Sequence, residues 1–268
     1  MRRATGVLLF ASLLIPAAAR GQAFDHGAFD ALLRLHVADG MVDYDAFGKA
    51  PEFGKYLDQL AGFDPAQLSR DDQLAFWINA YNAYTIRLIV QHEERKTIRN
   101  INKKFGLFKG LGPWSEKLVV VGGATYDLET VEQKIIRPTF REPRIHFALV
   151  CAAMGCPPLR SEAFAGARLD QQLDDQAKVF LTASPRKNWV DLEGRTVWVS
   201  QVFQFNDYQK DFGGSEAAVM RFVAKYHPAG AVRQLLEAGT AKLSYTDYDW
   251  TLNSQEQAQR LTAGSGAR

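Results

Sequence analysis

One long segment constrains the fold of this chain more than any other. After Ser69 the sequence reads RDDQLAFWINAYNAYTIRLIVQH, ending at His92. Ser69 can cap a helix, and the acidic residues that follow it suit the positive end of a helix dipole. Apolar or aromatic residues occupy almost the whole circumference of the predicted helix, which is typical of a helix buried on all sides. We therefore expect the rest of the chain to pack around it.

Shorter patterns of both kinds surround this central helix. Helical spacing or a capping residue predicts helices at 28–37, 54–61, 127–137, 169–181 and 216–226. Short apolar runs bounded by turn residues predict strands at 117–121, 144–151, 189–191, 196–199 and 242–245. A basic loop is expected at 95–113, and no linker divides the chain. The prediction is one mixed α+β domain, residues 24–253, with a central buried helix and a small β-sheet.

The first 23 residues have the composition of a signal peptide. Arg2 and Arg3 precede an apolar stretch of about ten residues, and small residues follow it, so cleavage is expected after Ala19 or Ala23. The apolar stretch is too short to span a membrane, which takes about 20 residues, and no later segment resembles a span. We expect an exported protein, periplasmic or secreted. The polar, small residues 254–268 are predicted to be a disordered tail.

Charge excludes one class of partner. The formal net charge is +2, but removal of the leader takes three arginines with it and leaves 29 basic against 30 acidic side chains. A nearly neutral body has no electrostatic reason to bind a phosphate backbone, so nucleic acid is not expected as a partner. No spacing of His, Cys, Asp or Glu predicts a metal site, and no cofactor motif is present.

Several blocks of sequence resemble a known family, the domain-of-unknown-function 547 family. They are VDYDAF (42–47), QLAFWINAYNAYTI (73–86), DLETVEQKIIR (127–137), RIHFALVCAAMGCPPLR (144–160), VSQVFQFNDYQKDF (199–212) and YDWTLN (248–253). The resemblance spans roughly residues 25–253 and implies no assigned activity. In the family pattern a His follows the acid of the 127–137 helix, where this chain has Gln133, and the usual Trp-Tyr pair is replaced around Phe205-Asn206.

The two cysteines allow opposite interpretations. Cys151 and Cys156 are the only cysteines in the chain and have four residues between them, one of which is a glycine. They can form a small-loop disulfide, as expected in an oxidising compartment, or remain inert buried thiols. Alternatively one is a thiolate nucleophile with His146 as its base. If 144–151 is a strand, His146 and Cys151 lie on opposite faces, so Cys156 is the preferred nucleophile.

Two asparagines of the central helix form a second candidate site. Asn79 and Asn82 are three residues apart and share one flank of the helix. A buried carboxamide needs hydrogen-bond partners, because leaving it unpaired costs roughly 1–3 kcal/mol. The partners are either irregular backbone, for instance around residues 100–113, or a pocket in which an asparagine orients a catalytic His or stabilises an oxyanion.

Charged residues give the remaining candidates. Glu132 is expected to pair with an arginine of an adjacent segment, and Arg144 or Arg160 could instead bind a ligand carboxylate, which the guanidinium fork suits. Asp211-Phe212-Gly213 matches the magnesium tripeptide of kinases only by chance, because no phosphate loop accompanies it.

Two functional hypotheses follow from these residues. The first is an exported hydrolase or acyl-transfer enzyme in which Cys156 and His146 act with Asn79, and in which Asn82, Glu132, Arg144, Arg160 and Cys151 contribute to binding. The second is a non-catalytic binding domain with a Cys151–Cys156 disulfide. In either case the expected partner is an unidentified small molecule or peptide.

Overall fold

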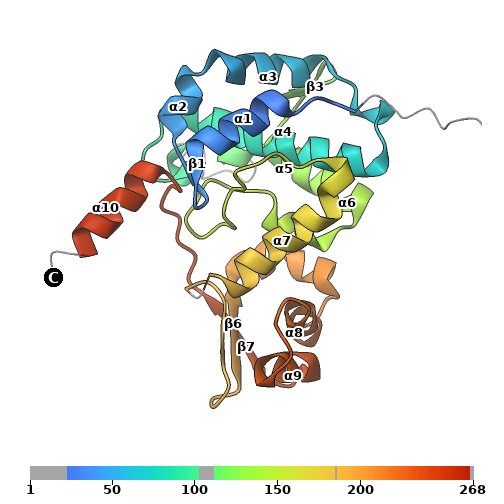
Figure 1. Cartoon of the computed structure of the whole chain (residues 1–268), viewed down its shortest axis with the longest axis vertical. Helices are drawn as coiled ribbons and strands as arrows, with labels where there is room; N and C mark the ends of the chain where they lie inside the picture. Colours follow the sequence, from blue (N-terminus) through green and yellow to red (C-terminus); the bar gives the residue numbers. More distant parts are fainter. Residues whose placement is uncertain (1–22, 103–111, 185, 266–268) are drawn as a thin grey trace, which may run out of the picture.

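The predicted central helix is present and buried. Helix α4 (Arg70–Gln91) begins after Ser69, whose hydroxyl oxygen accepts a hydrogen bond from the Asp72 backbone N–H. Its side chains are buried almost continuously from Leu74 to Ile89. Figure 1 shows α4 behind α1 (Gly27–His36), among the helices of the upper part of the molecule. The apolar circumference seen in the sequence is therefore explained by packing on every side.

The fold comes from a computed structural model that describes residues 23–102, 112–184 and 186–265. Residues 1–22 of the predicted leader and residues 103–111 of the predicted basic loop lie outside these residues. The other α-helices are α2 (Tyr44–Lys49), α3 (Pro51–Gly62), α5 (Leu128–Thr130), α6 (Arg137–Phe140), α7 (Leu169–Thr182), α8 (Glu216–Ala224), α9 (Ala231–Ala238) and α10 (Gln255–Ser265). Tighter or wider helical turns are η1 (Pro65–Gln67), η2 (Ile98–Asn100), η4 (Pro113–Ser115), η5 (Val131–Ile136), η6 (Pro143–Phe147), η7 (Gly166–Arg168), η8 (Gln201–Phe203) and η9 (Phe205–Phe212).

The strands form three small sheets within the described residues. Strands β1 (Val37–Ala38) and β2 (Met41–Val42) pair antiparallel, as do β3 (Val119–Val121) and β4 (Ala124–Tyr126). The third sheet has the order β5 (Trp189–Asp191), β6 (Thr196–Ser200), β7 (Lys242–Thr246). In it, β5 and β6, which match the strands predicted at 189–191 and 196–199, form an antiparallel hairpin, and β7 adds parallel to β6. The α+β fold class is confirmed.

Two hydrophobic clusters make up the core, and α7 joins them. Leu169 and Leu173 at the start of α7 belong to the cluster around α4. Ala177, Phe180 and Leu181 near its end belong to the cluster formed with β6, β7, α8 and α9. Figure 1 shows α7 running between the upper helices and the lower sheet and helices. The two hydrophobic clusters are thus connected through α7 into one packed unit.

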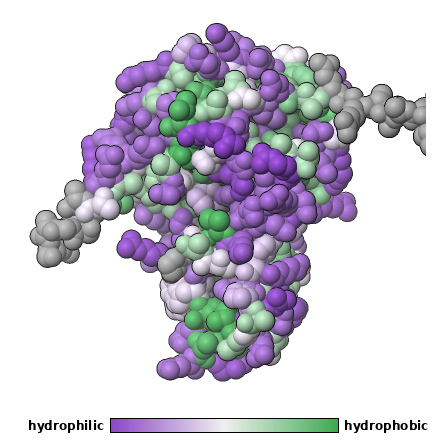
Figure 2. Space-filling model, viewed as in Figure 1, coloured by the Kyte–Doolittle hydropathy of each residue, from purple (hydrophilic) through white to green (hydrophobic). Residues whose placement is uncertain are grey.

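The face of the molecule seen in Figure 2 is mostly hydrophilic, with a hydrophobic area toward its lower end. On the β5–β6 hairpin, Trp189 and Leu192 are exposed. Within the described residues, no helix has the length and apolar character that a membrane crossing needs.

The strand predicted at 144–151 is wrong. Residues Pro143–Phe147 form the 3₁₀ turn η6, which Pro143 starts and the Glu142 side chain caps at the Arg144 N–H. The apolar segment that follows finds its partners in a side chain of α4: Asn82 donates to the Ala148 carbonyl at 2.9 Å and accepts from the Val150 N–H at 2.9 Å. An apolar run must be buried, but a carboxamide can satisfy its backbone as well as a neighbouring strand does.

The end predicted for the helix at 127–137 is also wrong, because Pro138 does not stop the helix. Asp127 caps the helix as expected, accepting from the Thr130 N–H. Beyond it the chain widens into the π-helical turn η5, in which the Arg137 N–H bonds to the Glu132 carbonyl. This shift starts a new helical segment, α6, with Pro138 in its first turn, where a missing N–H costs nothing. The helix therefore passes the proline.

The end of the chain is more ordered than its composition predicts. Residues 254–268 were expected to be disordered, whereas Gln255–Ser265 form α10. Ser254 accepts from the Gln257 N–H, and the Gln255 and Gln257 side chains donate to the carbonyls of His36 and Arg95. Such contacts with distant backbone leave no signal in local composition.

Candidate functional site

A cavity of about 400 Å³, which we call the His146 pocket, gathers several of the predicted residues. Glu132 comes from η5, His146 from η6 and Cys151 from the segment after it. Aromatic side chains make up much of the remaining wall: Tyr81, Trp114, Phe205, Tyr208, Tyr248 and Trp250. These elements are far apart in sequence, so tertiary packing alone assembles the pocket.

Local backbone irregularity positions both walls of this pocket. Glu132 and Gln133 lie in the π-helical turn η5, a kind of turn often found at functional sites. Across from them, Asn206 and Asp207 have φ values of +44° and +59°, which kink η9 immediately before Tyr208. The Tyr208 hydroxyl donates to Glu132 Oε1 and accepts from the Gln133 side chain at 3.1 Å. Gln133 is thus a partner of Tyr208.

His146 lies at the floor of the pocket with its side chain fully buried. Its Nε2 is 2.7 Å from Asp211 Oδ2, and its ring stacks on Tyr208 with centroids 3.9 Å apart. Its other nitrogen, Nδ1, lies 4.0 Å from Glu132 Oε1. The imidazole is therefore placed between two carboxylates, with one tight contact and one open one.

Asp211 is held in its ionised form. Burial by itself would raise its pKa, but hydrogen bonds and charge from His146 and Arg137 lower the pKa to about 2. Arg137 Nε donates to Asp211 Oδ2 at 2.8 Å, and its guanidinium lies over the Tyr208 ring at 4.8 Å. With Asp211 accepting, the Nε2–H tautomer of His146 is favoured, which leaves the lone pair of the neutral ring on Nδ1.

The missing hydrogen-bond partner of His146 Nδ1 is unusual in this molecule. Among the described residues, His146 Nδ1 is the only buried side-chain nitrogen or oxygen that has no hydrogen-bond partner. Buried polar atoms in folded proteins are nearly always paired, and an exception calls for an explanation. The nearest carboxylate is that of Glu132, whose side chain stays 12% exposed. Asp211, His146 and Glu132 thus form a row of ionisable side chains that ends at the pocket.

Of the alternatives considered for the two cysteines, the structure shows the disulfide. Cys151 and Cys156 form a disulfide with Cα atoms 6.2 Å apart, and no cysteine is free in this structure, which describes both cysteines of the chain. The Tyr248 hydroxyl lies 3.0 Å from Cys151 Sγ and 3.1 Å from Cys156 Sγ. Only Cys151 lines the His146 pocket, and Cys156 lines a different cavity. The preference for Cys156 over Cys151 beside His146 was wrong, because it assumed the strand that η6 replaces.

Both asparagines of α4 bond irregular backbone. Asn79 donates to the Phe164 carbonyl at 2.8 Å and accepts from the Phe164 N–H at 2.9 Å. Asn82 donates to the Ala148 carbonyl and accepts from the Val150 N–H. The bonded segments are 148–150 and 163–164 rather than the expected 100–113. With both ends of each carboxamide occupied, the geometry supports a structural role, and the proposed catalytic role of Asn79 loses its basis.

The predicted arginines are occupied by acidic side chains. Arg144 bonds Glu142, Asp170 and Asp174, each at 2.7 or 2.8 Å. Arg160 bonds Glu162 at 2.5 Å and lines the cavity of Cys156, away from His146. The expected pairing of Glu132 with an arginine was wrong, since its partners are Tyr208 and His146.

Sequence reasoning missed Asp211 and Tyr208. Asp211 was set aside with the chance kinase-like tripeptide, and Tyr208 was not singled out. The usable signal was the block VSQVFQFNDYQKDF itself, which places an Asp and a Tyr three residues apart on one helical face. Nothing local in that block indicates that this face meets His146.

Comparison with known proteins finds one matching family, and no function is assigned to that family. Residues 65–181 match the family described as "Protein of unknown function, DUF547". The matched segment includes Glu132 and His146 and ends before Tyr208 and Asp211. No curated protein and no solved structure shows significant similarity to the chain. Within the described residues there is also no cluster of His, Cys, Asp and Glu that could hold a metal ion.

Proposed function

Since residues 65–181 belong to the DUF547 family of unknown function, we propose an activity from the pocket alone: general acid–base catalysis on a small molecule, with Glu132 as the proton-exchanging group. The observation that carries the proposal is the unpaired Nδ1 of His146, 4.0 Å from Glu132. Catalytic hydrogen bonds are often long before substrate binds and tighten in the complex.

Each residue has a separate part in this proposal. Glu132 reaches the pocket and exchanges a proton with the ligand. His146 takes up or returns that proton through Nδ1, and Asp211 orients the imidazole and stabilises its charged form. Tyr208 holds the Glu132 carboxylate in place through its hydroxyl. Hydrolysis remains the reaction class that fits best, with water activated by Glu132 in place of a thiolate nucleophile.

The ligand is proposed to be a small organic molecule. A volume of about 400 Å³ suits one. Within the described residues, the ionisable groups that line the pocket include Glu129 and Glu132 and no lysine or arginine. Aromatic walls with carboxylates favour neutral or cationic ligands over anionic ones.

We also propose that the protein works outside the cytoplasm. The signal-peptide pattern of residues 1–23 and a disulfide at the pocket wall both support this location.

Glu132→Gln tests the activity, because it keeps the acceptor for Tyr208 and removes the exchangeable proton. The control is Glu193→Gln, the same change at an exposed turn position. The probes are p-nitrophenyl butyrate, a p-nitroanilide and p-nitrophenyl β-glucoside. We expect turnover of at least one probe to fall by about 100-fold or more in Glu132→Gln. It should be unchanged in Glu193→Gln and after treatment with iodoacetamide. Equal turnover by Glu132→Gln and the unsubstituted protein would show the proposal to be wrong.

A second candidate is a binding domain without catalysis. The stack of Tyr208 on His146, which buries the imidazole fully, favours it. Absence of turnover with all three probes, together with ligand-dependent changes in tryptophan fluorescence from Trp114 and Trp250, would favour this candidate over the enzyme.

A further inference from the structure

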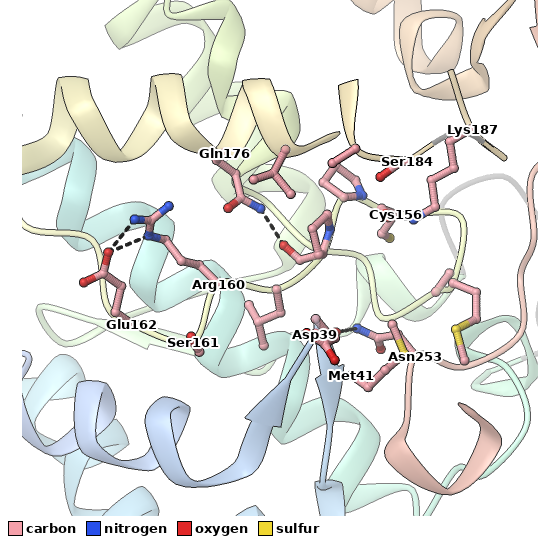
Figure 3. A pocket seen from close by; sticks show the side chains of 18 of the residues that line it. Asp39, Met41, Cys156, Arg160, Ser161, Glu162, Gln176, Ser184, Lys187 and Asn253 are labelled. Atoms are coloured by element: carbon pink, nitrogen blue, oxygen red, sulfur yellow. Dashed lines mark hydrogen bonds and ion pairs between the residues drawn. The ribbon is translucent and has the colours of Figure 1, made fainter. Parts of the chain in front are cut away.

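A second cavity, of about 550 Å³, lies on the other side of the disulfide loop. We call it the Lys187 cavity. Cys156 and Pro157 line it, and Pro157 also lines the His146 pocket, so one short loop separates the two. Figure 3 shows Gln176 of α7 on one side and Asp39, Met41 and Asn253 on the other, with Arg160 and Lys187 toward opposite ends.

Lys187 is an ammonium group with little to compensate for its burial. Its Nζ donates to the Cys156 carbonyl at 2.6 Å and lies 5.7 Å from the centre of the Phe180 ring. Within the described residues no carboxylate forms an ion pair with it. Burial lowers the pKa of Lys187 to about 8, although the charge of Asp249 acts in the opposite direction. A carboxylate beside Nζ would offset the lost hydration.

The other cations of the cavity already have partners. Arg160 and Arg34 both bond Glu162, at 2.5 and 3.4 Å, and Arg34 also bonds Asp30. Figure 3 shows the Arg160–Glu162 pair pointing toward each other at the end remote from Lys187. Among the described lining residues, Lys187 is therefore the one cation left to receive an anion.

The rest of the wall mixes apolar and polar side chains. Met41, Ala153, Met154, Leu159 and Val179 supply an apolar part, and polar atoms come from Asp39, Ser161, Gln176, Ser184 and Asn253. An apolar part of the wall, together with one ammonium that has no carboxylate partner, suits a molecule with an acidic head and an apolar body.

We propose that the Lys187 cavity binds a small carboxylate with an apolar body, the carboxylate lying against Lys187 Nζ. This site is separate from the His146 pocket, and the proposal does not depend on the function proposed for that pocket. The acid has two chemical sources, a free short-chain acid or the C-terminus of a peptide, and both present the same head group.

Calorimetry with hexanoate tests the proposal on the disulfide-bonded protein. Hexanoate should bind saturably, whereas hexan-1-ol and hexylamine should bind at least tenfold more weakly. Lys187→Met keeps the apolar stem and should weaken hexanoate binding tenfold or more. Lys55→Met, the same change at an exposed position of α3, should have no effect. Lys187→Arg keeps the charge and should retain most of the affinity.

Proton uptake gives a second readout on the unsubstituted protein. At pH 8 about half of the Lys187 side chains are uncharged, so hexanoate should draw in roughly half a proton per site, measured in buffers of different ionisation enthalpy. The neighbouring ionisable groups are Asp249 and, along the cavity, Arg34, Asp39, Arg160 and Glu162. Lys187→Met should abolish this uptake.

Three results would overturn the proposal: no saturable hexanoate binding, equal binding of hexanol, or equal binding by the Lys187→Met protein. A comparison of acetyl-Ala-Ala-Leu as free acid and as amide then identifies the source. Tighter binding of the free-acid peptide than of hexanoate supports a peptide C-terminus, and the reverse supports a free acid.

Discussion

The imidazole of His146 lies flat against the phenol ring of Tyr208, with centroids 3.9 Å apart, while the Tyr208 hydroxyl reaches past it to Glu132. One aromatic side chain thus covers the buried histidine and anchors the carboxylate that faces the pocket. Because Tyr208 follows the kink at Asn206 and Asp207, the arrangement depends on backbone that local propensity does not favour.

Removing the Tyr208 hydroxyl should destabilise the fold. Tyr208→Phe keeps the stack on His146 but removes the hydroxyl that donates to Glu132, and the expected loss is about 1–3 kcal/mol in the free energy of unfolding. Urea denaturation at pH 7 measures it. The matched change Tyr245→Phe, at a half-buried tyrosine of β7, should cost less than about 0.5 kcal/mol. Equal losses in the two variants would contradict the anchoring role.

Acid should weaken the fold through His26 first. Burial lowers the pKa of His26 from its ordinary 6.5 to about 4, with Asp25 and Asp72 opposing, and the ring bonds the Tyr56 hydroxyl at 2.7 Å. Between these pH values the unfolded chain binds a proton that the folded protein does not, so stability should fall as the pH drops from 6.5 toward 4.

Urea denaturation across that range measures the slope. His26→Gln keeps a polar side chain and should flatten the curve. The same change at exposed His92, His92→Gln, is the comparison, although it also removes a contact with Glu116. A curve for His26→Gln that is as steep as that of the unsubstituted protein would refute this account.

Stronger acid should act through Asp211. Its pKa is lowered from 3.8 to about 2, so its ionised form stabilises the folded protein above pH 4, and this contribution is lost as the pH falls through 2. Asp211→Asn should reduce the slope of stability against pH between 4 and 2. Asp247→Asn, at an exposed position, should leave it intact. Some slope should persist in Asp211→Asn, because the pKa of Glu162 is also lowered to about 2: burial opposes this shift, and the hydrogen bonds of Arg160, Gln172 and Arg168 outweigh it.

The disulfide should be present in the purified protein and contribute to stability. Intact mass after alkylation without reduction should show no modification and a mass two hydrogens below that of the dithiol. For a six-residue loop, chain entropy predicts a loss of about 2 kcal/mol in Cys151→Ala/Cys156→Ala. Two alkylated thiols in the unreduced protein would show that the pair is open and would restore the thiol mechanism.

Local rules were reliable wherever a segment's structure depends on its own residues. The caps at Ser69 and Asp127, the buried circumference of α4 and the β5–β6 hairpin follow from neighbours a few positions apart. The same rules failed at 144–151, since an apolar run demands burial but does not say whether a strand or Asn82 satisfies its backbone.

Sequence patterns were enough to predict the α+β class, the central helix, the candidate residues His146 and Glu132, and the pair of cysteines able to bridge. The contacts of each of these residues became known only from the folded structure. His146 and Asp211 are 65 residues apart, and Glu132 and Tyr208 are 76 apart. Contacts over such separations arise when distant elements pack to bury their apolar faces, so no pattern within either segment can specify the partner.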